Sequence, residues 1–245
     1  MVLLSQLKSL MSENSNTLHF LIELRTKLIY SLILLLILFT VLIYFANELY
    51  TLLALPLLKF LPQGHLIATQ IVSPFFVPFK LAFWVAMLLA MPFFLYQLWT
   101  FIAPALYSKE RRLVWPLLFI SSGLFYMGIA FAYFVIFPIL FRFLSHTAPH
   151  GVIVSPDIAE YLDFTMRLLL TFGVLFEIPI GMTLLVAMNI FSRSRFIQMR
   201  SYAILGAFIV GMLFAPPDVL SQTLMAIPIC LLYETGIILS AFVSK

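Results

Sequence analysis

Long apolar stretches separated by short polar segments run through the whole chain, and this pattern predicts an all-α integral membrane protein. The first four stretches are long enough to cross ~30 Å of hydrocarbon at ~1.5 Å of rise per residue. The fifth covers only about 22 Å on the same rise, so we expect the last two spans to be short and to thin the bilayer locally. The six expected transmembrane helices are residues 28–47, 81–99, 113–141, 162–189, 201–215 and 220–238.

The longest connection between expected spans covers residues 46–79. Its stretch ELYTLLALPLLKFLP is apolar but interrupted by prolines, which favours an amphipathic helix in the membrane interface over a further span. The chain shows no internal repeat and no soluble domain. We therefore expect a single transmembrane domain over residues 1–245, with residues 1–27 as an N-terminal tail.

Composition supports the membrane assignment. The chain is 63% hydrophobic and 10% charged, whereas a soluble domain is roughly half apolar and about a quarter charged. The single cysteine, Cys230, excludes an intrachain disulfide scaffold. The N-terminus lacks a basic start and a small-residue cleavage site, so we expect no cleaved signal peptide.

The distribution of basic residues predicts the orientation. Ten of them lie on the N-terminal tail and alternate connections, and four lie on the opposite side. The side richer in Lys and Arg is expected to be cytoplasmic, which places both termini in the cytoplasm. The ten are Lys8, Arg25, Lys27, Lys109, Arg111, Arg112, Arg193, Arg195, Arg200 and Lys245.

Signatures of an enzyme are missing from the sequence. There is no H-E-x-x-H, no G-x-S-x-G and no phosphate-binding loop. All histidines lie outside the expected spans, so we interpret them as interface residues rather than metal or haem ligands at membrane depth. We predict no catalytic, metal or cofactor site. The histidines are His19, His65, His146 and His150.

Glu177 lies in the stretch FGVLFEIPI, near the middle of an expected span. A charge at that depth costs ~2.5–3.5 kcal/mol, so acids inside membrane helices are functional by default. Pro179 follows two residues later and predicts a kink beside the acid. Two alternatives remain: an internal hydrogen bond to Gln97 or Gln222, or a titrating role in a proton-coupled transporter or channel.

Two further glutamates lie outside the spans, in strongly basic surroundings. Glu23 precedes the first span, and Glu110 lies in the connection YSKERR. One interpretation is local pairing with Arg25, Arg111 or Arg112, each pair contributing ~0–1 kcal/mol. The other is a pair of carboxylates that bind two arginines of a ligand in bidentate fashion.

The last connection carries polar residues of its own. Asp218 follows Pro216-Pro217 and is placed to cap the final helix as an ordinary N-cap. Gln222 lies one turn further and is expected to hydrogen-bond a neighbouring helix, for ~0.6–2 kcal/mol.

Five stretches, in order along the chain, carry a family resemblance. They are HFLIELRTKL, SPFFVPFK, QLWTFIAPALYSKERR, FGVLFEIPI and GMLFAPPDVLSQT. Together they resemble the TatC family, the multispanning receptor subunit of the twin-arginine protein translocase. The resemblance covers about residues 15–240, and five motifs at fitting positions of a six-span pattern are far more specific than one.

The resemblance implies a concave, glove-like bundle in the bacterial plasma (inner) membrane. It implies a receptor for the twin-arginine signal peptides of folded precursor proteins, and export driven by the proton-motive force. The implied partners are TatA-type and TatB-type single-span membrane subunits, other copies of the chain and the lipid bilayer. Nucleic acid is not expected.

The resemblance also implies roles for individual residues. Glu23 and Glu110 resemble the acids that receive the two arginines, and Glu177 resembles the intramembrane glutamate on the concave side. Pro56 resembles the outer-loop proline important for assembly. The recognition surface around the two acids is implied at Arg25, Phe101, Pro104, Leu106, Tyr107 and Arg111.

A partner-docking patch is implied near the C-terminus. Met212 and Gln222 resemble positions where a single-span partner helix docks, and Asp218 matches the aspartate of the APPD motif. The sequence departs from the family pattern at Ala215, where close relatives often have threonine. This departure removes one hydroxyl from the implied patch.

Overall fold

The computed structural model describes residues 22–23, 25–58, 67–69, 71–102, 114–140, 142, 157–214 and 219–243. Every longer regular element in these residues is helical, and the extended backbone is limited to one isolated parallel bridge between Ile67 and Asp157. The all-α prediction is therefore confirmed.

The helices follow one another with few interruptions. Residues 25–42 are helical and continue through the 3-10 turn η1 into α2, so the helix expected in the first connection is contiguous with the first span. The element α4 likewise continues into the π-helical segment η4. The bounds are η1 Ile43–Phe45, α2 Ala46–Leu58, α3 Ser73–Ile102, α4 Val114–Phe131, η4 Ala132–Ile136, α6 Ile158–Leu175, α7 Ile178–Ala187, α8 Arg193–Gln198, α9 Arg200–Phe214 and α10 Val219–Ala241.

Five helices in the described ranges are long and apolar enough to cross a membrane. The fifth expected span corresponds to α9, a shorter apolar helix of 15 residues. Its partner α10 has 23 residues and belongs with the longer helices, although the sequence suggested a short one. The five are Arg25–Leu52, Ser73–Thr100, Trp115–Leu140, Ile158–Ala187 and Ser221–Ala241.

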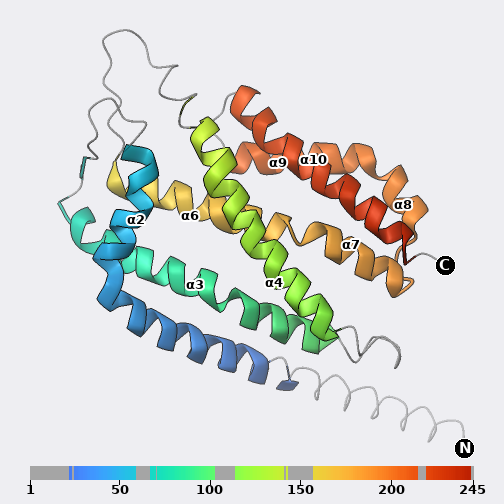
Figure 1. Ribbon diagram of the computed structural model, residues 1–245, viewed down its shortest axis with the longest axis horizontal. Helices are drawn as coiled ribbons and strands as arrows, with labels where there is room; N and C mark the ends of the chain where they lie inside the picture. Colours follow the sequence, from blue (N-terminus) through green and yellow to red (C-terminus); the bar gives the residue numbers. More distant parts are fainter. Residues whose placement is uncertain are drawn as a thin grey trace, which may run out of the picture.

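The ends of the helices gather at two opposite sides of the molecule (Figure 1). The first helix begins, α3 ends and α4 begins on the side that also carries α8. On the other side lie α2, the start of α6 and the end of α9. Successive long helices therefore alternate in direction, as expected for neighbouring spans.

The main core lies where α3, α4 and α6 meet. Its fully buried side chains include Leu81 of α3, Phe125 of α4 and Phe172 of α6. Glycine permits the close approach of α4 to α6: a Cβ at Gly128 would lie 2.5 Å from the carbonyl oxygen of Phe172. Any larger residue there would push the two helices apart.

A second packing unit is formed by α7, α8, α9 and α10. Met182, Phe196 and Ile237 form one small core, in which the Tyr233 hydroxyl donates to the Phe196 carbonyl at 2.8 Å. Ala207, Ala226 and Ile229 form another between α9 and α10. The two units are joined through α6 and α7, which are consecutive pieces of one candidate span.

Asp157 caps the start of α6 and ties it to the segment 67–69. Its carboxylate accepts hydrogen bonds from the hydroxyl of Thr69 (2.6 Å), the backbone N–H of Thr69 (2.8 Å) and that of Ala159 (2.8 Å). The bond from the Thr69 hydroxyl contributes most, and together these bonds lower the pKa of Asp157 from 3.8 to about 2. The ionised carboxylate thus holds the first connection against α6.

We expect Asp157→Asn to lower the free energy of unfolding by ~1 kcal/mol at neutral pH, because it removes charge-assisted hydrogen bonds. The folded-state pKa lies below the unfolded value, so this contribution is present above pH 3.8 and is lost as the pH falls to about 2. Thermal unfolding in detergent, measured across this pH range, should show the difference in stability between parent and variant shrinking as the pH falls. A stability difference that stays constant down to the lowest pH would contradict a stabilising role of the ionised Asp157 carboxylate.

Candidate functional site around Glu177 and the α9–α10 patch

Glu177 lies at a break between two helices. The element α6 ends at Leu175, residues 176–177 form a turn, and α7 begins at Ile178 with Pro179 in its first turn. Proline is tolerated there because the first N–H groups of a helix have no intrahelical acceptor. The kink predicted from Pro179 is therefore a complete interruption of the helix, placed between the two packing units.

The carboxylate of Glu177 turns toward α4. Its Oε2 accepts a hydrogen bond from the hydroxyl of Ser121, a residue with no exposed surface. The candidate partners from the sequence, Gln97 and Gln222, do not supply this bond. Gln222 instead donates from Nε2 to the Phe208 carbonyl at 2.9 Å.

The second carboxylate oxygen of Glu177 has no hydrogen-bond partner. Oε1 is buried, and nothing in the described residues donates to it. A buried oxygen without a donor costs ~1–3 kcal/mol, more when it carries charge. The site can therefore accept a further donor, such as water or a polar side chain of a partner helix.

Sequence reasoning missed Ser121. The signal was present as two adjacent serines, Ser121 and Ser122, inside the apolar run of α4. Serine inside a membrane helix often donates to its own backbone, so the pair alone did not indicate a bond to another helix.

The proposed docking residues Met212 and Gln222 lie close together. The helices α9 and α10 approach so tightly at Gly211 that a Cβ there would lie 2.9 Å from the carbonyl oxygen of Gln222. Met212 follows directly in the chain and is 61% exposed. It belongs to an exposed apolar face of α9 that also includes Ile204, Leu205, Phe208, Ile209 and Leu213.

Glu23 lies in the first helical residues that the structure describes, just before the candidate span Arg25–Leu52. Its Oε1 forms an ion pair with Nζ of Lys27 at 2.7 Å, one helical turn away. Local pairing is therefore present, but with Lys27 rather than with the arginines considered from the sequence. An i,i+4 pair of this kind contributes only about 0.3–0.5 kcal/mol. Arg25 is exposed beside it.

Several predicted site residues lie outside the described part of the chain. Phe101 and Pro56 lie within α3 and α2, but the structure describes only their backbone. Those entirely outside the described ranges are Pro104, Leu106, Tyr107, Glu110, Arg111 and Asp218.

Among the residues that the structure describes, no group of three or more His, Cys, Asp or Glu side chains converges as metal ligands would. The prediction of no metal or cofactor site rests on the sequence. The described site consists of a buried acid at a helix break and an exposed apolar patch on α9 and α10. The two features lie apart along α10: the break at Pro179 packs beside Gly236, where a Cβ would lie 3.2 Å from Cα of Pro179, whereas Gln222 lies about 21 Å away along the same helix. The patch offers packing surface for a helix, and the acid offers an unsatisfied hydrogen-bond acceptor.

The sequence is similar to a well-defined family. The family described as "Sec-independent protein translocase protein (TatC)" matches residues 19–228. A protein of that name from Escherichia coli K12 is 55% identical over 223 residues, which cover 91% of this chain and 86% of the relative. The Haemophilus influenzae protein of the same name is 48% identical, with 91% and 87% covered.

A solved structure shares the fold. It is described as "Crystal Structure of Twin Arginine Translocase Receptor- TatC". The two chains are 38% identical and superpose with a TM-score of 0.83, over 92% of this chain and 100% of the other. A second crystal structure of that receptor, in DDM, gives the same TM-score and identity.

Proposed function

Because this chain belongs to the TatC family of Sec-independent protein translocase proteins, we propose that it is the signal-peptide receptor and core scaffold of a twin-arginine translocase. The family is a membrane-embedded translocase component and not an enzyme. The observation that carries the proposal is the superposition on a twin-arginine translocase receptor over 92% of this chain. It favours a receptor over the transporter alternative for Glu177.

The proposed ligand is a signal peptide with two adjacent arginines. Glu23 supports this role because its carboxylate pairs with Lys27 of the same helix in a partly exposed i,i+4 ion pair. A guanidinium binds a carboxylate through two parallel hydrogen bonds and can replace such a weak pair. Glu110 is proposed as the second acceptor, within a surface that includes Arg25, Phe101, Pro104, Leu106, Tyr107 and Arg111.

The proposed partners in transport are single-span subunits of the TatA and TatB type. The exposed face of α9 around Met212, together with Gln222, supplies the packing surface. Glu177 supplies an acceptor that a polar side chain of the partner can satisfy. Asp218, and Pro56 of α2, are proposed to contribute to assembly, and transport is proposed to use the proton-motive force.

The proposed location is the bacterial plasma (inner) membrane, with both termini cytoplasmic. The start of the first helix, with Arg25 and Lys27, lies on the same side of the molecule as α8, which carries Arg193 and Arg195 (Figure 1). This clustering of basic residues on one side supports the orientation.

Site-specific photo-crosslinking tests the receptor proposal. A photoreactive residue is placed at Glu110 or at Glu23, and a precursor is presented with its Arg-Arg signal or with a Lys-Lys substitution. We expect crosslinks that require the two arginines at both positions. A probe at Glu48, exposed on α2, is the matched control and should give none. Equal crosslinking of both signals, or none to either with the protein folded, would refute the proposal.

A further inference from the structure

An arginine lies well inside a candidate membrane span and pairs with no acid in the part of the chain that the structure describes. Arg167 is the tenth residue of α6, about 14 Å along the helix from its start. Its side chain is exposed, and none of the described residues forms an ion pair with it. Arginine at this depth is rare and functional by default, because the cation needs a counter-charge.

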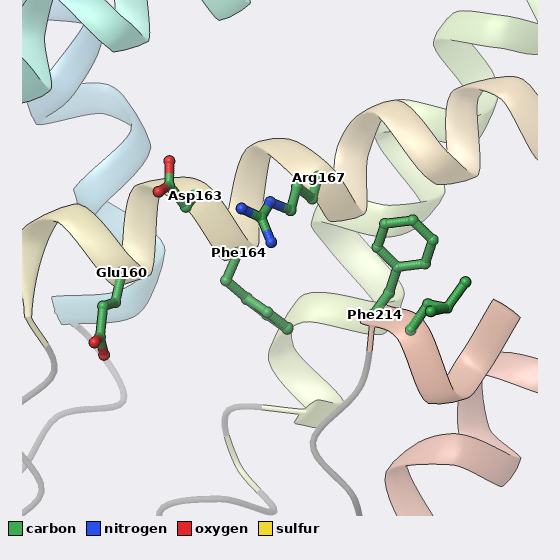
Figure 2. A pocket seen from close by; sticks show the side chains of 6 residues that line it. Glu160, Asp163, Phe164, Arg167 and Phe214 are labelled. Carbon is green, nitrogen blue, oxygen red and sulfur yellow. The ribbon is translucent and has the colours of Figure 1, made fainter.

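The acid best placed to pair with Arg167 is already engaged elsewhere. Asp163 lies one turn before it, the i,i+4 spacing of a helical ion pair. Both oxygens of Asp163 instead contact Nζ of Lys80 on α3, at 2.5 and 2.6 Å. In Figure 2 the Asp163 carboxylate points away from Arg167. The bond between α3 and α6 thus leaves the guanidinium available.

Arg167 lines a pocket between α6 and the end of α9. The pocket has a volume of about 310 Å³ and is also lined by Glu160, Phe164, Leu213, Phe214 and Asp163, whose charge is paired with Lys80. The aromatic and aliphatic side chains form an apolar wall, which is suited to lipid chains. Leu213 is 68% exposed, so the wall opens toward the surroundings of the bundle.

The two free charges of the pocket lie at different depths. Glu160 is exposed, lies within the first turn of α6 and forms no ion pair with the described residues. Arg167 lies two turns deeper, but its guanidinium extends back toward the start of the helix (Figure 2). Helical side chains lean toward the N-terminus, and long cations reach from the hydrocarbon to the interface in this way. The pocket is therefore negative near the membrane surface and positive further in.

We propose that this pocket holds the headgroup of an ethanolamine phospholipid. The phosphate of such a lipid lies deeper than its ammonium, and a two-carbon linker joins them, which matches the order of the two charges. Arg167 donates hydrogen bonds to the phosphate oxygens, and Glu160 accepts from the ammonium. The acyl chains lie against Phe164, Leu213 and Phe214. The bound lipid would then fill the space between α6 and the end of α9.

Native mass spectrometry of the full chain in detergent tests this site. Phospholipids with identical acyl chains and ethanolamine, choline or glycerol headgroups are titrated separately. We expect the parent protein to bind the ethanolamine lipid most tightly, because choline cannot donate hydrogen bonds to Glu160 and the glycerol headgroup carries no cation. Loss of charge-assisted hydrogen bonds in Arg167→Gln should weaken binding about tenfold. Glu160→Gln should remove the preference for ethanolamine over choline while binding persists.

Matched variants make the outcome specific. Arg193→Gln on α8 and Glu48→Gln on α2 change the same charges outside the pocket and should leave the preference intact. Arg167→Lys keeps the cation and should restore part of the binding, which also separates lost binding from lost folding. Equal binding of the three headgroups by the parent would overturn the proposal. Unchanged binding in Arg167→Gln, or a preference for the glycerol headgroup, would overturn it as well.

Discussion

Substitution of Glu177 by alanine is expected to reduce precursor transport by roughly tenfold or more, because a partner helix loses a hydrogen bond of ~1–2 kcal/mol inside the membrane. Binding of the signal peptide should stay within about twofold of the parent, since Glu23 lies at a helix end and Glu177 in the middle of a span. The measurements are transport into energised membrane vesicles and peptide affinity in detergent.

Ser121→Ala is the matched control for Glu177→Ala. Both variants remove the hydrogen bond between α4 and the α6–α7 break, but Ser121→Ala keeps the carboxylate. If Glu177 acts through a partner, Ser121→Ala retains most of the transport. If both variants lose transport equally, Glu177 has only a structural role.

Partner binding provides a second measurement for Glu177. Cysteines at Met212 and Gln222 should crosslink to a single-span partner helix in the parent and less in Glu177→Ala. If no crosslink forms at either position with both partner types present, the docking surface does not lie on α9 and α10.

Substitution of Glu110 or Glu23 by alanine is expected to weaken binding of an Arg-Arg signal peptide by roughly tenfold to a hundredfold. In the proposed receptor role, each variant removes a charge-assisted, bidentate bond of ~1.5–3 kcal/mol. Isothermal titration with the purified protein measures the affinity. A Lys-Lys peptide should bind the parent weakly and lose little more in the variants, because lysine cannot form the bidentate pair.

Lys27 provides a further control at this site. If the peptide binds Glu23 as proposed, Lys27 competes for the same carboxylate, so Lys27→Gln should tighten binding by about twofold, as expected for an exposed pair of ~0.5 kcal/mol. Weaker Arg-Arg binding in Lys27→Gln would show that Lys27 orients Glu23 rather than competes for it. Glu48→Ala should leave the affinity unchanged.

The candidate site was only partly predictable from the sequence. Glu177 and the adjacent Pro179 were recognisable because a charge and a proline inside an apolar run are local exceptions. The hydrogen-bond partner of Glu177 could not be predicted, because it is a serine 56 positions away in the chain on another helix. The partner of Gln222 was also uncertain, and the structure places its amide against the carbonyl of Phe208 on α9.

The sequence by itself determined the helical class, the long apolar spans, the short α9 and the position of the buried acid. These features follow from local chemistry, because hydrocarbon requires every backbone group to be bonded within a helix. Only the tertiary structure decided that Ser121 bonds Glu177, and that Asp163 pairs with Lys80 rather than with Arg167, which forms no ion pair within the described ranges. Helices in lipid are apolar on nearly all faces, so their sequence lacks the amphipathic period that would indicate which faces meet.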